Sequence, residues 1–200
     1  MDRTGQRMSR RGRDLRWGGG GGTTGTGKFY SNGFDPTLFV GEPADVAAYL
    51  GAAQLLFARM LTLPMPTVAA LQGHTYAAGA IFAMAHDTRI MRADRGFFCL
   101  PEIYLGLALP DGLIIPESMA ALLHCRMPAQ TAHEAILGGR RFGGPEALTA
   151  GIVQAALSED EVVPCAVERA AKLADTRGPA LGAMKNWMYR DVVGMLTGTL

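Results

Sequence analysis

Apolar positions in the first half of the chain repeat at two different periods. Between Asp45 and Leu61 they recur every three or four residues, at 46, 50, 53, 57 and 60, with a proline on either side. This spacing predicts an amphipathic helix. The segment TVAALQG (67–73) begins with β-branched residues and ends in glycine, so it predicts a buried strand. The small-residue segment HTYAAGAIFAMAHD (74–87) predicts a helix that starts almost at once.

The rest of the chain alternates between the same two patterns. Strands are predicted at 87–93, 97–100 and 152–157. Because strands alternate with helices, an α/β fold with largely buried strands is expected, with helices gathered toward the C-terminus. The further helices are predicted at 114–124, 128–137, 145–150, 161–174 and 179–196.

Composition narrows the class of protein. The 200 residues carry a net charge of +1 and are 48% hydrophobic, which indicates one globular domain without a general bias toward nucleic acid or membrane. Cys99, Cys125 and Cys165 are far apart, which favours a reduced compartment. No run approaches the ~20 apolar residues of a membrane span, and the last residues, GTL, differ from the peroxisomal SKL. We therefore expect a cytoplasmic protein, with the peroxisome or mitochondrion as alternatives.

The first 22 residues differ in composition from the rest. They contain six arginines against two aspartates and end in a run of glycines. Such a segment buries too little apolar surface to order itself, so a disordered leader is predicted over 1–22. A nucleic-acid-binding tail and an Arg-rich organelle presequence are the other interpretations.

Two junctions offer backbone groups to a ligand. They are SNGF (31–34) and GHTYAAG (73–79), where a strand is followed by a helix opening on small residues. Small residues let another molecule approach the backbone, and the first N–H groups of a helix have no intrahelical partner. Accessible backbone and unpaired N–H groups together can stabilise an oxygen that becomes negatively charged during a reaction. Alternatively, Ala77, Ala78 and Gly79 only allow tight packing of helix on strand.

Glu102 is the candidate general base. It is one acid among apolar neighbours in FFCLPEIYLGLALPDG (97–112), directly after Pro101. Burial disfavours the charged carboxylate, so the pKa of Glu102 is expected to be raised toward neutrality, as a general base requires. The alternative is a structural acid bonded to a backbone amide or an arginine.

Other constellations are absent from the sequence. TGTG before Lys28 lacks the complete phosphate-loop frame, and no GxSxG motif occurs. Asp35 and Asp111 are interpreted as loop-capping acids. Metal binding is not expected, because no HExxH motif or i, i+4 pair occurs among His74, His86, His124 and His133.

Four segments in combination resemble the crotonase family, the enoyl-CoA hydratase/isomerase superfamily, over roughly residues 23 to 195. SNGFD and the lone glutamate of PEI look closest to the Δ3,Δ2-enoyl-CoA isomerases. The segments are TGTGKFYSNGFD (24–35), LPMPTVAALQGHTYAAGAIFAMAHD (63–87), RGFFCLPEIYLGLALPD (95–111) and GRRFGGPEALTAGIV (139–153).

The resemblance implies a fold and a domain organisation. The fold is α/β, a crotonase-like ββα spiral core with C-terminal helices, and the family's first strands are missing at the N-terminus. The implied divisions are the leader (1–22), the core (23–158) and a C-terminal helical region (159–200). A homotrimer or hexamer is implied if the fold is complete, and Lys185 matches a helix that lies near coenzyme A in the family.

The resemblance also implies roles for site residues. The N–H groups of Phe34 and Ala78 would form the oxyanion hole, although the family often has glycine at the second position. Ile81 stands where hydratases carry a second glutamate, and an isoleucine cannot orient water. The implied substrate-binding residues are Lys28, Ser31, Asn32, Gly33, Gly79 and Ile81, with Lys28 to Asn32 near the adenine.

The implied reaction is isomerisation of 3-enoyl-CoA to 2-trans-enoyl-CoA in fatty acid β-oxidation. Glu102 would take a proton from C2 and return one at C4. No metal, flavin or nicotinamide is needed, since coenzyme A is part of the acyl-CoA thioester substrate, and neither nucleic acid nor membrane is expected as a partner. The alternatives are hydration or another acyl-CoA reaction, and a truncated non-catalytic protein that binds acyl-CoA.

Overall fold

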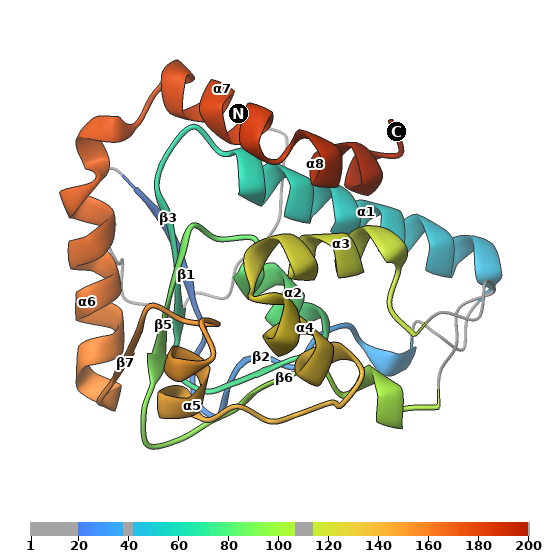
Figure 1. Ribbon diagram of the computed structural model, residues 1–200, viewed down its shortest axis with the longest axis horizontal. Coiled ribbons are helices and arrows are strands. Elements are labelled where there is room, and N and C mark those ends of the chain that lie inside the picture. Colours follow the sequence, from blue (N-terminus) through green and yellow to red (C-terminus); the bar gives the residue numbers. More distant parts are fainter. Residues whose placement is uncertain (1–19, 38–41, 107–113, 200) are drawn as a thin grey trace, which may run out of the picture.

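The computed structural model describes residues 20–37, 42–106 and 114–199, and its strands form two parallel sheets (Figure 1). The larger sheet has the order β1-β3-β5-β7, and the smaller has the order β2-β4-β6. Successive strands therefore alternate between the sheets, so the chain winds as a spiral. The strands are β1 (Gly21–Thr24), β2 (Phe29–Ser31), β3 (Thr67–Leu71), β4 (His74–Tyr76), β5 (Thr88–Arg92), β6 (Phe98–Cys99) and β7 (Ala155–Leu157).

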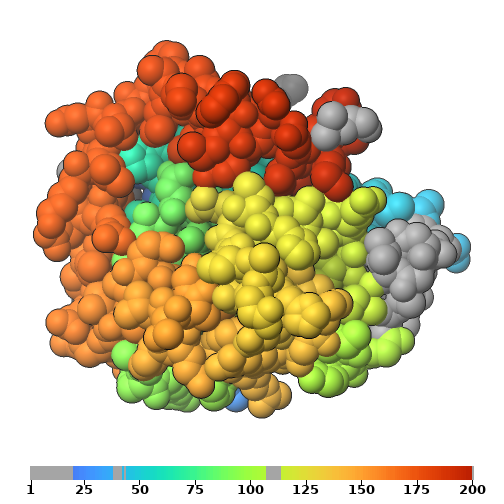
Figure 2. Space-filling view, viewed as in Figure 1, coloured from blue at the N-terminus to red at the C-terminus, as the bar shows by residue number. Residues whose placement is uncertain are grey.

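Helices surround the sheets and gather in the second half of the chain, as the sequence predicts (Figure 1). In the space-filling view, α7 and α8 lie across the top of the molecule, and α3, α4 and α5 form much of the face below them (Figure 2). The helices are α1 (Pro43–Thr62), α2 (Ala78–Met84), η2 (Pro101–Tyr104), α3 (Glu117–Arg126), α4 (Ala129–Ile136), α5 (Gly144–Thr149), α6 (Glu159–Lys172), η3 (Ala174–Thr176), α7 (Pro179–Met188) and α8 (Arg190–Thr197).

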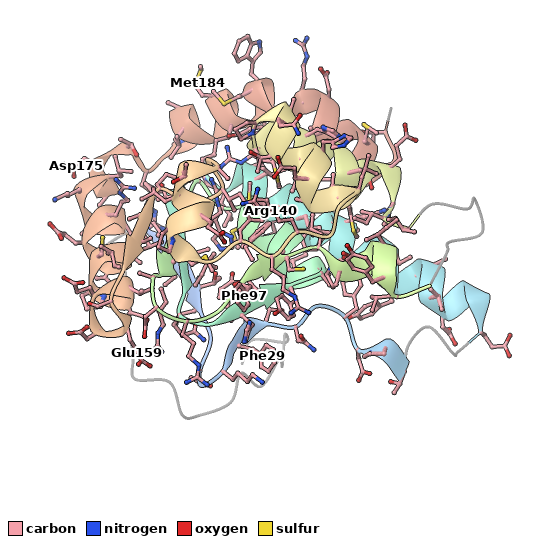
Figure 3. The ribbon with its side chains drawn as sticks, turned by 60° about the horizontal axis from the view of Figure 1, so that its bottom comes forward. Phe29, Phe97, Arg140, Glu159, Asp175 and Met184 are labelled. Carbon is pink, nitrogen blue, oxygen red and sulfur yellow. The ribbon has the colours of Figure 1, made fainter. Side chains whose placement is uncertain are left out.

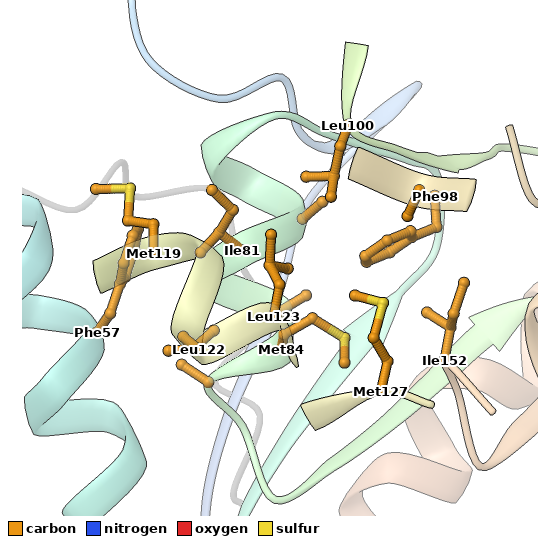
Figure 4. Close-up of a cluster of buried hydrophobic side chains, with 14 of the residues drawn as sticks. Phe57, Ile81, Met84, Phe98, Leu100, Met119, Leu122, Leu123, Met127 and Ile152 are labelled. Atoms are coloured by element: carbon orange, nitrogen blue, oxygen red, sulfur yellow. The ribbon is translucent and has the colours of Figure 1, made fainter. Parts of the chain in front are cut away.

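β3 separates two hydrophobic clusters. All five of its residues are buried, as expected for a parallel strand that is covered on both faces. Val68 and Ala70 face α6 in the smaller cluster, whereas Ala69 and Leu71 belong to the main core, because successive side chains of a strand point to opposite faces. The main core gathers side chains from α1, α2, α3, α4 and α8 and from the strands, and Figure 4 shows part of it.

The first predicted helix and two of the buried strands are confirmed with small shifts of their ends. The helix predicted at 45–61 is α1, and the strands predicted at 67–73 and 87–93 are β3 and β5. By length and composition alone, α1 from Ala44 to Thr62 could cross a membrane, with a mean hydropathy of 1.2. One such helix is weak evidence for a span, and α1 packs against α7 and α8 here.

Two predicted helices are wrong in extent. The segment 74–87 begins as strand β4, and α2 starts only at Ala78. A strand of three residues is too short to show a period of two. The helix predicted at 179–196 is two helices, because the backbone departs from helical geometry at Tyr189 (φ −108°, ψ 13°). The hydroxyl of Tyr189 there accepts a hydrogen bond from Arg126 Nη1 at 2.6 Å.

The leader and the first strand overlap. Residues 1–19 lie outside the described residues, but Gly21 and Gly22, predicted as leader, pair with Thr67 and Val68 in β1. The glycines allow a close approach to α6: a Cβ atom on Gly20 would lie 2.9 Å from Cβ of Ala170. Glycine thus serves packing here, where composition alone predicts disorder.

Candidate active site

The three strands of the small sheet end at the same edge. Parallel pairing aligns Ser31 with Thr75 and Tyr76 with Cys99, and neighbouring strands lie ~4.8 Å apart. The residues that follow these strands within three positions therefore emerge at this edge. They are the Gly33–Phe34 bend after β2, Ala77–Ala78 after β4 and Glu102 after β6.

The first two of these segments are in contact. A Cβ atom on Gly33 (φ +91°) would lie 3.2 Å from the backbone nitrogen of Ala78 and 2.8 Å from Cβ of Ala77. A Cβ atom on Gly79 would lie 2.5 Å from Cβ of Ser31. Only glycine allows both approaches, so the bend of SNGF lies directly against the start of α2.

Ala77 holds the turn between β4 and α2 in a strained conformation. It has φ +53° and ψ −131°, a region that favours glycine. Its N–H donates to the carbonyl of Cys99 at 3.0 Å, which fixes the end of β4 to β6. The next residue, Ala78, is the first of α2, so its N–H has no acceptor within the helix.

A cavity of about 450 Å³ opens beside these two segments. Five of the predicted site residues line it, namely Ser31, Gly33, Phe34, Ala78 and Gly79. The sequence analysis did not predict the opposite wall, although Tyr49, Ala52 and Leu56 are apolar residues of α1 outside the predicted stripe. That wall consists of Tyr49, Ala52, Ala53, Leu56 and Phe57, together with Phe82 of α2.

Glu102 stands on the single turn η2, directly after β6 and the fully buried Leu100. Burial raises the pKa of Glu102 to about 7, and a hydrogen bond from its own backbone acts in the opposite direction. Its Oε2 is buried, and no residue in the described ranges is its hydrogen-bond partner. Glu102 is not among the residues that line the cavity. It is connected to the site through β6, the neighbour of β4 in the small sheet.

The remaining predicted site residues lie elsewhere. Ile81 is 2% exposed and packs in the core beside Met119 and Leu123 (Figure 4). Asn32 is exposed. Lys28 precedes β2, at the opposite end of the small sheet, with Nζ 5.4 Å from the ring centroid of Phe29.

The sequence analysis also names two loop acids, Asp35 and Asp111, and Lys185. Asp35 accepts hydrogen bonds from the backbone and hydroxyl of Thr37, which lowers its pKa, whereas Asp111 lies outside the described residues. Lys185 bonds within the protein, to Asp87 Oδ2 at 2.6 Å and to the carbonyl of Met65 at 2.9 Å.

An aromatic group near the amino ends of the small sheet was not predicted. The centroid of the His74 ring lies 5.4 Å from that of Phe29, 5.1 Å from that of Tyr76 and 5.7 Å from that of Phe97. Phe29 and Phe97 are labelled in Figure 3. Burial and the nearby cationic side chains, Lys28 foremost, lower the pKa of His74. Among the described residues, no group of three or more His, Cys, Asp or Glu side chains could hold a metal ion.

Comparison with known proteins places this geometry in a family. Residues 23–198 match the model of the enoyl-CoA hydratase/isomerase family. The chain belongs to this family. It is 36% identical over 189 residues to "Enoyl-CoA delta isomerase 2, peroxisomal" of Arabidopsis thaliana, covering 87% of this chain and 75% of the relative.

Two further comparisons agree with the assignment. The chain is 35% identical over 185 residues to "Enoyl-CoA delta isomerase 3" of the same plant, covering 87% of this chain and 74% of the relative. The structure superposes on human mitochondrial delta3-delta2-enoyl-CoA isomerase with a TM-score of 0.78 at 26% identity, covering 90% of this chain and 69% of the human one. The predicted crotonase fold is thereby confirmed.

Proposed function

We propose that this chain isomerises 3-enoyl-CoA to 2-trans-enoyl-CoA. The observation that carries the proposal is Glu102, a buried carboxyl group with its pKa raised to about 7 and no bonded partner in the described ranges for Oε2. It follows β6, and the neighbouring strand β4 leads into the start of α2, against which the SNGF bend packs. The names of the plant and human relatives support the same reaction.

The proposed mechanism uses one carboxyl group twice. With a pKa of about 7, Glu102 is about half ionised at neutral pH. Its carboxylate takes a proton from C2 of the substrate, and the resulting carboxylic acid returns a proton at C4, so the double bond moves by one position. The N–H groups of Phe34 and Ala78 donate to the thioester oxygen, which carries the negative charge of the dienolate. One such donor typically lowers the barrier by about 3 kcal/mol.

Ile81 favours isomerisation over hydration. A hydratase must hold and activate a water molecule, and this requires a second polar group beside the substrate. Ile81 is a hydrocarbon side chain buried among Leu100, Met119 and Leu123. A proton shift within the substrate needs no bound water, so one acid suffices.

Partners and compartment follow from the same proposal. The substrate is an acyl-CoA thioester, with coenzyme A as part of the substrate and no separate cofactor. A homotrimer or hexamer remains a prediction, which light scattering of the purified protein would test. The names of two plant relatives fit a peroxisomal location, so the peroxisome replaces the cytoplasm as the proposed compartment.

The proposal is tested by turnover of a 3-enoyl-CoA to the conjugated 2-enoyl-CoA. The reaction is followed by its change in ultraviolet absorbance. We expect Glu102→Gln to lower kcat by about 10²- to 10⁴-fold, the usual contribution of a general acid–base group. Glu168→Gln is the matched control, because Glu168 is exposed and, among the described residues, its ion pair is with Lys172 on α6. Wild-type activity retained in Glu102→Gln would refute the role of Glu102, and a folded wild type without turnover would refute the isomerase.

A further inference from the structure

The cavity beside the Gly33–Phe34 bend runs along one stripe of α1. Five residues of α1 line it, at positions 49, 52, 53, 56 and 57. Position 49, the pair 52 and 53, and the pair 56 and 57 are three or four residues apart, so they share one face of the helix. From 49 to 57 a helix rises about 12 Å. The cavity is therefore elongated parallel to α1.

Aromatic side chains bound both ends of the stripe. The rings of Phe34 and Tyr49 make an edge contact at 5.2 Å between centroids, and those of Phe57 and Phe82 lie 6.0 Å apart. Between the pairs, the stripe of α1 consists of two alanines and a leucine. Alanine is the reason that space remains between the rings, since a larger side chain at 52 or 53 would fill it.

The chemistry of the walls defines the occupant. None of the residues that line the cavity is charged, and its polar groups are limited to backbone atoms, Ser31 and the hydroxyl of Tyr49. The volume of about 450 Å³ lies within the range of small-molecule sites, ~300–1,000 Å³. An uncharged apolar ligand fits such walls, whereas a charged ligand would lose its hydration without gaining a partner.

We infer that this cavity holds the acyl chain of the substrate and that Ala52 and Ala53 set a preference for straight chains of up to about ten carbons. An extended peptide spans ~3.5 Å over the three backbone bonds of one residue, which is about 1.2 Å per bond. We use the same length per bond for an extended acyl chain. A stripe of about 12 Å thus accommodates about ten carbons. The inference rests on the proposed function for the placement of the thioester at the Phe34 end.

Binding of saturated acyl-CoAs tests the inference without requiring turnover. Butanoyl-, hexanoyl-, octanoyl-, decanoyl- and tetradecanoyl-CoA are titrated against the full chain by calorimetry. Each methylene added up to ten carbons is expected to tighten binding by about fourfold, the transfer value of a buried CH₂. Beyond ten carbons the affinity should level off. A dissociation constant that is flat from four to ten carbons would overturn the inference.

A matched pair of variants identifies the residue that sets the length. Ala52→Phe fills the stripe from an exposed position, and Ala47→Phe adds the same side chain on the opposite face of α1, also at an exposed position. We expect Ala52→Phe to weaken decanoyl-CoA on the order of 50-fold, the value of three lost methylenes. Butanoyl-CoA should be nearly unaffected, and Ala47→Phe should resemble the wild type.

A second variant guards against misfolding of the first. Leu56 is 50% exposed, so Leu56→Glu places a carboxylate in the cavity with little effect on the core, and it should weaken decanoyl-CoA more than butanoyl-CoA. Equal effects of Ala52→Phe and Ala47→Phe would overturn the inference. If the protein binds acyl-CoA with the expected length dependence but shows no turnover, the inference holds and the proposed function is refuted. If the protein shows turnover but no length dependence in binding, the proposed function holds and the inference is refuted.

Discussion

Two groups of buried polar side chains differ in how completely they are paired. At the C-terminal end of α2, Asp87 Oδ2 accepts hydrogen bonds from Lys185 Nζ at 2.6 Å and from the backbone of Thr67 at 2.8 Å. The guanidinium groups of Arg89 and Arg126 donate to the carbonyl of His86 at 2.8 and 2.7 Å. Each cation in this network therefore has acceptors within the protein.

Glu102, beyond the other end of the same helix, has the opposite character. Its Oε2 is buried, but the described part of the chain offers it no partner. Buried polar groups are normally satisfied, so an unsatisfied carboxyl group destabilises the fold and is expected where chemistry requires it. The comparison predicts that substitutions in the network destabilise the protein, whereas substitution of Glu102 stabilises it.

The largest expected effect is the loss of Lys185. Its side chain is 8% exposed and bonds to Asp87 across 98 positions of sequence. Lys185→Met leaves the carboxylate of Asp87 without its cation, and breaking a buried pair in this way costs about 3 to 5 kcal/mol. We expect the free energy of unfolding in urea to fall by about 3 kcal/mol, since Asp87 retains some exposure.

Lys172→Met provides the control for this prediction. Lys172 forms an exposed pair with Glu168 one turn away on α6, and such pairs contribute less than about 0.5 kcal/mol. A double variant, Lys185→Met with Asp87→Asn, should cost less than the two single losses added together. Additive losses would show that Lys185 and Asp87 do not act as a pair.

The next effect has the opposite sign. Glu102→Gln should stabilise the protein by about 3 kcal/mol at pH 8, because its pKa of about 7 lies ~2.5 above the ordinary 4.5 and each unit corresponds to 1.36 kcal/mol. A raised pKa means that the folded state holds the proton more tightly. The wild type therefore has this stability in full below pH 4.5 and loses it as the pH rises through 7.

Urea unfolding at two pH values measures this difference. At pH 4 the wild-type carboxyl group is mostly protonated in both states, and glutamine should then have nearly the same stability as glutamic acid. At pH 8 the variant should be the more stable protein. A wild type that is more stable than the variant at pH 8 would mean that the ionised carboxylate is paired, and the contrast with the network of Asp87 would disappear.

Sequence patterns predicted one of these two regions and not the other. Glu102 was recognisable because its apolar neighbours are adjacent in sequence, and burial of a single acid can be inferred from them. The partners of Asp87 could not be found in this way, because Lys185 and Arg126 are brought to it by the packing of α7 and α3. The strand β4 was missed for a local reason, since three residues before a helix carry no readable period.

The pH dependence of turnover sharpens the contrast further. If Glu102 is the base, it must be ionised in the free enzyme, so kcat/KM should fall below pH 7 by tenfold for each pH unit. At pH 5 the value should be about 100-fold below its plateau. Initial rates measured between pH 5 and 9 give the acidic limb of the pH profile of kcat/KM. A limb centred near 4.5 would indicate a carboxyl group that is solvated or paired.

The smallest effect concerns the backbone strain between β4 and α2. Ala77 is the only described residue other than glycine with a positive φ, and glycine adopts this conformation without the steric penalty. Ala77→Gly should therefore raise the free energy of unfolding by about 1 kcal/mol, the strain relieved less the greater flexibility of the unfolded chain. Ala80→Gly, three residues further along in α2, should lower it by at least about 1 kcal/mol, because glycine disfavours a helix.

Turnover of Ala77→Gly shows what the strain is for. A Cβ atom on Gly33 would lie 2.8 Å from Cβ of Ala77, so the methyl group of Ala77 is part of the surface against which the SNGF bend packs. Its removal loosens the bend that carries Phe34, and we expect kcat to fall severalfold while stability rises. A variant that is more stable and equally active would show that the strain at Ala77 does not serve to position the bend, which would then be held by Ser31, Gly33 and Gly79 alone.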